Sequence, residues 1–66
     1  MRIMVNGAPH EANGDTSVSM LLESLGLSQR PCAVEVNADV IPRNRHATCT
    51  LQEGDRVELV TLVGGG

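Results

Sequence analysis

The sequence contains no phenylalanine, tyrosine or tryptophan, so any core must be built from aliphatic side chains. Lysine is absent too, and five arginines against eight acidic residues leave a formal net charge of -3. Proteins that bind nucleic acids usually carry a basic stripe and often stack bases on aromatic rings. The composition therefore argues against a nucleic-acid partner.

Long apolar runs are also absent, so we expect no membrane span. The first residues, MRIMVN, lack the apolar region of a signal peptide, and the cytoplasm is the expected compartment. The only cysteines, Cys32 and Cys49, do not form a C-x-x-C motif, which indicates neither a zinc site nor a redox pair. We expect reduced thiols, no metal and no bound cofactor, with a Cys32–Cys49 disulfide as the minor alternative.

A chain of 66 residues forms one small domain. Short chains bury a smaller fraction of their surface than long ones, so a core and a deep pocket compete for the same residues. The size favours a small module that works with a partner over a self-contained enzyme.

Alternating apolar residues predict the strands. Residues 2–6 alternate and run into Asn6-Gly7, a strong hairpin signal, with a weaker return strand at 8–13. Residues 32–37 alternate with Cys32, Val34 and Val36 on the inner face, and Glu35 and Glu58 are expected to point away from the helix. A brief strand at 40–41 and a long one at 56–63, after a turn at Gly54, complete the set.

One segment has the periodicity of a helix instead. Its apolar residues recur at i, i+3, i+4 and i+7, namely Val18, Leu21, Leu22 and Leu25. Thr16 or Ser17 can cap its start, and Gly26 suits the left-handed residue that ends a helix.

This order of elements predicts an α+β fold, a small mixed sheet with one helix packed on one face. The first and last strands are the most apolar and therefore the expected centre of the sheet. Two central strands joined through a helix crossover should lie side by side and parallel.

The sequence ends in Gly64-Gly65-Gly66. A frayed terminus or a cloning remnant would look the same.

The glycines also allow a chemical interpretation, in which a flexible tail at 64–66 follows a domain at 1–63. Glycine has no side chain to clash in a narrow channel, and three residues reach at most about 10 Å. A terminal carboxylate activated as a mixed anhydride with AMP could then accept sulfur, or acylate a lysine amine.

Taken together, several short motifs resemble the ThiS family, the ubiquitin-like β-grasp sulfur carriers of thiamine biosynthesis. The resemblance covers essentially the whole chain. The motifs are Val5-Asn6-Gly7, Leu21-Leu22, the run 33–37, Ile41-Pro42-Arg43 with His46, Glu53-Gly54-Asp55 with Val57-Glu58, and the final glycines.

The resemblance implies that Gly66 is adenylylated by an E1-like, ATP-dependent adenylyltransferase of the ThiF type. Sulfur from a cysteine desulfurase relay then makes a thiocarboxylate, which a thiazole synthase of the ThiG type consumes. Gly64 and Gly65 would thread the tail into these partners, and the chain itself would be a carrier and no enzyme. Two other roles stay open, the sulfur carrier of molybdopterin synthase and a ubiquitin-like modifier. An inert β-grasp interaction module is the remaining alternative.

Two further groups of residues invite a functional interpretation. Met4, Val60 and Leu62 are predicted to lie on the uncovered sheet face and to form part of a partner-docking surface. Arg43, Arg45 and His46 are expected in a solvated loop, and an anion site or an electrostatic partner contact is the alternative.

Overall fold

The computed structural model describes residues 1–62. Within them lie five strands, one α-helix and one 3-10 helix. Their bounds are β1 Arg2–Val5, β2 Ala8–Glu11, α1 Val18–Ser24, β3 Cys32–Val36, β4 Asp39–Ile41, η1 Arg43–Arg45 and β5 Arg56–Thr61.

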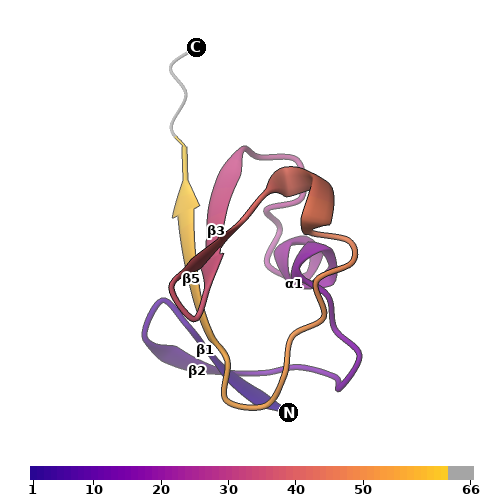
Figure 1. Ribbon diagram of the computed structural model, residues 1–66, viewed down its shortest axis with the longest axis vertical. Helices are drawn as coiled ribbons and strands as arrows, with labels where there is room; N and C mark the ends of the chain where they lie inside the picture. The colour runs from indigo at the N-terminus through magenta and orange to yellow at the C-terminus, as the bar shows by residue number, and fades with distance from the viewer. Residues whose placement is uncertain (63–66) are drawn as a thin grey trace.

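The five strands form one mixed sheet in the order β2-β1-β5-β3-β4. The pairing of β1 with β5 is parallel, with Met4 opposite Arg56 and Val5 opposite Val57, and the other pairs are antiparallel. Helix α1 packs on one side of this sheet (Figure 1). The topology is the ubiquitin-like β-grasp, and the prediction of a parallel pair made by the first and last strands is confirmed.

Both hairpins are closed by two residues in the left-handed region. Asn6 and Gly7 have φ of 51° and 83° and join Val5 to Ala8. Asn37 and Ala38, with φ of 52° and 72°, link β3 to β4 in the same way. Positive φ at both positions gives a turn whose twist matches that of the strands.

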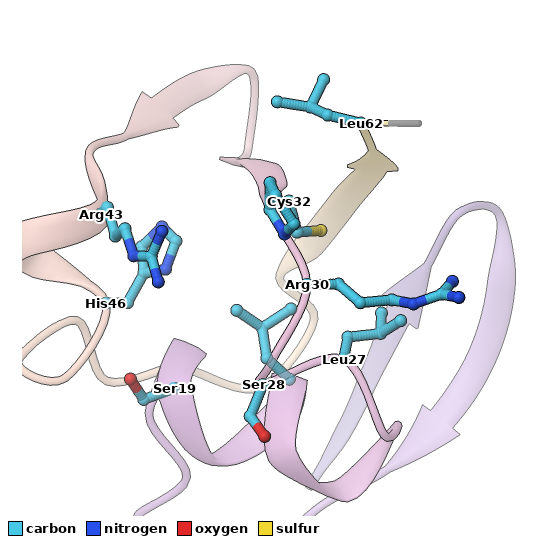
Figure 2. A pocket seen from close by; sticks show the side chains of 10 residues that line it. Ser19, Leu27, Ser28, Arg30, Cys32, Arg43, His46 and Leu62 are labelled. Carbon is cyan, nitrogen blue, oxygen red and sulfur yellow. The ribbon is translucent and has the colours of Figure 1, made fainter. Parts of the chain in front are cut away.

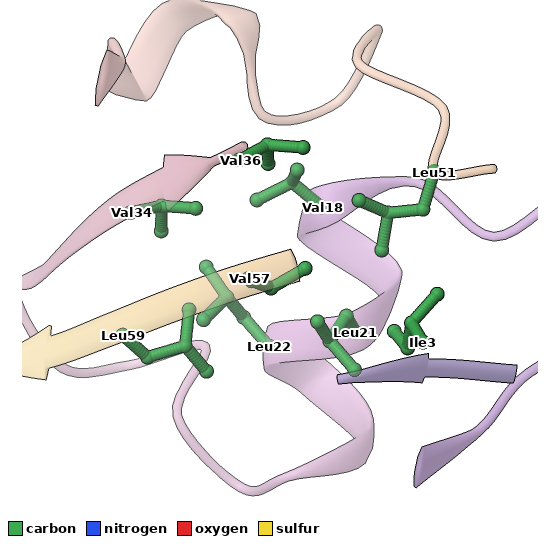
Figure 3. Packing of buried hydrophobic residues seen from close by; sticks show 9 residues of the cluster. All are labelled: Ile3, Val18, Leu21, Leu22, Val34, Val36, Leu51, Val57 and Leu59. Carbon is green, nitrogen blue, oxygen red and sulfur yellow. The ribbon is translucent and has the colours of Figure 1, made fainter. Parts of the chain in front are cut away.

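The core is entirely aliphatic, as the composition requires. Side chains from α1 meet the inner faces of β1, β3 and β5, and one residue from the loop before β5 completes the cluster (Figure 3). The nine buried residues are Ile3, Val18, Leu21, Leu22, Val34, Val36, Leu51, Val57 and Leu59. Each fully buried side chain of this kind stabilises the fold by about 1.5–3 kcal/mol.

Helix α1 is short and depends on its neighbours. The Met20 amide donates to Ser17 Oγ at 3.1 Å, which identifies Ser17 as the N-cap. The Val18 amide donates to the Cys49 carbonyl at 2.9 Å, so the chain before β5 holds the start of the helix. Gly26, with φ of 74°, follows its end as predicted.

Two expectations about burial were wrong, and one buried residue was not anticipated. Leu25 lies beyond the end of α1 and is 37% exposed, so it does not extend the helix's apolar face. Leu51 joins the core, although a single leucine between polar residues shows no periodicity. His46 was expected in a solvated loop, yet only 8% of its surface is exposed. It follows η1 directly, and its ring contacts the Ile41 carbonyl.

Asn6 continues the parallel pairing beyond the end of β1 with its side chain. Its Oδ1 accepts from the Leu59 amide at 2.7 Å, and its Nδ2 donates to the Leu59 carbonyl at 3.2 Å. The side-chain amide therefore takes the place of a backbone peptide alongside β5.

Replacing Asn6 with glycine should remove both bonds while tolerating the positive φ. The Leu59 amide and carbonyl lose their partners, so the free energy of unfolding should fall by about 1–3 kcal/mol. Urea denaturation measures this, and hydrogen exchange at the Leu59 amide locates it. Asn6→Asp keeps the acceptor and should protect that amide better than Asn6→Gly does. Unchanged stability in Asn6→Gly would contradict the bridging role.

Ala38, with φ of 72°, occupies a left-handed conformation that disfavours a side chain, whereas the matching turn position, with φ of 83°, holds Gly7, which has none. Ala38→Gly should therefore raise the free energy of unfolding, by up to about 1 kcal/mol after the entropic cost of glycine. Gly7→Ala is the reverse experiment. An added Cβ there meets no atom within 4 Å, so any loss of stability reports backbone strain alone. Equal thermal unfolding of Ala38→Gly and the parent would refute the strain argument.

Candidate functional site

Strand β5 carries the chain from the centre of the sheet toward the glycines. It is paired with β1 on one side and with β3 on the other. Beyond the strand, the Leu62 amide still donates to the Pro31 carbonyl at 3.0 Å. The predicted acceptor of AMP and sulfur, Gly66, and the threading residues Gly64 and Gly65 lie outside the described residues, as does the boundary between domain and tail.

The sheet face opposite α1 combines apolar and charged side chains. Because side chains alternate along a strand, the inward positions of Val57 and Leu59 turn Arg56, Glu58 and Val60 outward. Val60 is 59% exposed and Met4 is half-buried.

The three predicted docking residues do not form one continuous patch. Met4 is level with Arg56 on β5, so Glu58 lies between that position and Val60. Leu62 is 56% exposed beyond the end of β5, and it also contributes to the wall of a cavity. Contact of these residues with a partner stays a prediction.

Two carboxylates face each other on this open surface. Glu35 and Glu58 are both exposed, as predicted, and they are directly opposite in the β3–β5 register. Like charges at directly opposed positions destabilise a sheet. Val60, opposite Ala33, lies next along the same face. Along β5 the pair has Val60 on one side and Arg56 on the other, so this part of the face offers a partner both charged and apolar groups.

A cavity of about 340 Å³ opens at the end of β5 (Figure 2). Its walls come from α1, the segment between α1 and β3, the start of β3, the η1 region and the end of β5. The lining residues are Ser19, Leu22, Leu27, Ser28, Arg30, Pro31, Cys32, Arg43, His46 and Leu62.

His46 is fixed in the wall of this cavity. Its Nε2 lies 3.0 Å from the Ile41 carbonyl, and its own carbonyl accepts from the Ser19 amide at 2.9 Å. A carbonyl can only accept, so Nε2 carries the proton of that bond. The ring therefore ties the η1 segment to the end of β4.

Over residues 1–62 the structure brings together no group of three side chains able to hold a metal ion. Cys32 and Cys49 are free, half-buried thiols. Within the same residues, no helix is long and apolar enough to cross a membrane.

The fold and the sequence together define the class, a ubiquitin-like β-grasp protein. The profile of the ThiS family matches residues 3–66, and the chain belongs to that family. The sulfur carrier protein ThiS of Escherichia coli K12 is 30% identical over 66 residues, which cover all of both chains. A crystal structure of the thiamine biosynthesis protein ThiS from Geobacter metallireducens superposes with a TM-score of 0.84 at 33% identity, again over all of both chains.

Longer proteins contain a similar segment. A thiazole synthase of Magnetococcus marinus is 41% identical over 66 residues, which are all of this chain and 20% of that protein. A thiazole synthase of Paramagnetospirillum magneticum is 33% identical over the same share. This chain therefore spans about a fifth of the length of the thiazole synthases that it matches.

Relieving the repulsion between Glu35 and Glu58 should stabilise the fold. Glu58→Gln removes one of the two charges, and we expect the free energy of unfolding to rise by about 0.2–1 kcal/mol at neutral pH. Added salt should reduce this gain, because it screens exposed charges. Chemical denaturation at low and high salt measures both effects.

The matched control is Glu11→Gln. Glu11 faces Arg2 on the neighbouring strand pair, with 3.1 Å between the Arg2 Nε and the carboxylate. Loss of that attraction should leave stability unchanged or slightly lower. If Glu58→Gln destabilises the protein as much as Glu11→Gln does, the acidic pair is not a source of repulsion.

Proposed function

We propose that this ThiS-family chain is a sulfur carrier of thiamine biosynthesis, acted on by enzymes and not itself a catalyst. The observation that carries the proposal is the family match through residue 66, which includes the three glycines after the central strand. The β-grasp fold shared with ThiS of Geobacter metallireducens supports the same role.

In the proposed reaction, a carboxylate oxygen of Gly66 attacks the α-phosphorus of ATP, and pyrophosphate leaves. A sulfur nucleophile supplied by a cysteine desulfurase relay then attacks the acyl carbon, and AMP leaves. When that nucleophile is a persulfide, the product is an acyl disulfide. A thiol reductant then attacks the donor-side sulfur, breaks the S–S bond and leaves with the donor as a new disulfide. The carbonyl carbon of Gly66 then holds sulfur in place of one oxygen, as a thiocarboxylate. ATP belongs to the partner, an E1-like adenylyltransferase of the ThiF type.

The second proposed partner is a thiazole synthase of the ThiG type, which would take the sulfur for the thiazole ring. The support is that proteins named thiazole synthase contain a segment similar to this chain. A carrier segment and a synthase segment in one polypeptide indicate that the two work together. The cytoplasm is the proposed compartment, in agreement with two unpaired thiols.

Removing Gly65 and Gly66 tests the carrier chemistry. The truncated chain should fold as before, because the buried core ends at Leu59. It should yield no thiocarboxylate and should fail to support growth without thiamine. Intact-mass spectrometry of the parent, isolated from thiamine-starved cells, should show a species heavier by the difference between sulfur and oxygen, located at Gly66.

The matched control is Gly14→Ala, because an added Cβ at Gly14 meets no atom within 4 Å. That variant should keep both the thiocarboxylate and growth. Lysine conjugates in place of the thiocarboxylate would make the chain a protein modifier. Thiocarboxylate with loss of molybdopterin instead of thiamine would assign it to the molybdopterin branch.

Leu62→Asp tests the docking surface. The side chain is largely exposed, so the fold should survive while binding to the adenylyltransferase weakens by about tenfold or more. Met20→Asp is the control, since Met20 is 48% exposed on α1 and away from the open sheet face. Calorimetric titration compares the two variants. Equal affinities would exclude Leu62 from the interface, and a collapsed fold would show that its role is structural.

A further inference from the structure

The cavity at the end of β5 concentrates positive charge in a protein whose formal net charge is -3. The ionisable side chains in its lining are Arg30, Arg43, His46 and Cys32, and no carboxylate is among them. An anion entering this cavity would therefore meet no carboxylate in its walls, although acidic residues outnumber arginines in the chain as a whole.

Within residues 1–62, the guanidinium groups of the two cavity arginines form no hydrogen bond or ion pair. Within residues 1–62 the one ion pair joins Arg2 to Glu11, outside the cavity. No carboxylate in that part of the chain lies within 4.0 Å of the guanidinium of Arg30 or Arg43, and neither guanidinium donates a hydrogen bond there. A guanidinium has five N–H donors in a planar fork that matches phosphate and carboxylate oxygens.

His46 adds a second polar group beside Arg43. Its Nε2 is committed to the Ile41 carbonyl, and its Nδ1 has no partner among the described residues. No fully buried side-chain nitrogen or oxygen in those residues lacks a hydrogen bond, so Nδ1 is not completely sealed from solvent. Figure 2 shows Arg43 and His46 together on one wall, whereas Arg30 lies across Cys32 from them and its guanidinium points away.

We propose that this cavity binds an oxyanion of the phosphate class, held chiefly by Arg43 and His46. The Arg43 fork would donate to two oxygens, and His46 Nδ1 would accept from a protonated phosphate oxygen or, when protonated, donate to a charged one. The chain has no aromatic ring on which a nucleobase could stack. Recognition should thus extend to the phosphate and not to the base.

The cavity lies next to the end of β5, where the chain continues toward the glycines. Leu62 forms part of its wall and is followed after one residue by the three glycines. A bound anion would therefore lie beside the point at which the chain leaves the sheet. The assignment stands without the proposed function, because an inert module with the same cavity would bind the same anion.

Titration of the ¹⁵N-labelled chain with inorganic phosphate, pyrophosphate and AMP, followed by amide NMR shifts, tests the site. We expect saturable shifts at the cavity lining, including Leu62. AMP should bind no more tightly than phosphate. Tighter binding of AMP would overturn the claim that the base is not read, and would identify a nucleotide as the source of the phosphate.

Two arginine variants distinguish anion binding in the cavity from general attraction of anions to a positively charged surface. Arg43→Gln removes a cavity residue, whereas Arg45→Gln removes the same charge from the same 3-10 helix at a position outside the lining. Arg43→Gln should raise the Kd of pyrophosphate by about tenfold or more, since a charged hydrogen bond contributes about 1.5–3 kcal/mol. Arg45→Gln should change it less than about twofold. Thermal unfolding checks that both variants fold.

Three results would overturn the proposal. Shifts that rise linearly with anion concentration would indicate no site. Equal weakening in both variants would indicate attraction to the surface as a whole. Saturation by an acidic peptide, where neither phosphate nor pyrophosphate saturates, would make the cavity a peptide site.

Discussion

The parallel pairing of β1 with β5 is the constraint on which the rest of the structure depends. It joins the two ends of the described chain, with the Met4 amide bonded to the Asp55 carbonyl and the Asn6 amide bonded to the Val57 carbonyl, each at 2.9 Å. Parallel neighbours cannot be connected by a tight turn, so the chain must cross over between them. That crossover places α1 on one face of the sheet, and the core forms between the two.

The same pairing determines how the chain presents its end. Because β5 is flanked by β1 and β3, its direction is fixed by β1 at Arg56 and Val57 and by β3 as far as Thr61. The Asn6 side chain extends the contact past the last residue of β1, to Leu59. A tail attached to a central strand starts from a defined point, which would help the proposed adenylyltransferase to dock the domain and reach a nearby carboxylate.

Local patterns predicted the strands, the helix and the first hairpin, because period two, period 3.6 and an Asn-Gly turn are written in consecutive residues. The sequence pattern could not reveal contacts that depend on register or on distant segments. Glu35 and Glu58 were each expected to face outward, but only the register shows that they oppose each other. Leu51 and His46 are single residues in a polar stretch, and their burial follows from the folding of that stretch back onto α1. The role proposed for Gly66 rests on the family resemblance, since no pattern of side chains encodes the chemistry of a backbone carboxylate.

Charge is divided between two parts of the domain. The open sheet face carries the opposed pair Glu35 and Glu58, whereas the cavity at the end of β5 carries Arg43 and His46 without a carboxylate. A partner that docked on the open face through a cation would gain from relieving the repulsion there, and would leave the cavity on the helix side free. Docking and anion binding would then be separate events, coupled only through β5 and Leu62. Since the net charge repels phosphates at long range, a phosphate-class anion would gain its affinity within the cavity, where the Arg43 donors are close and no carboxylate lies in the lining.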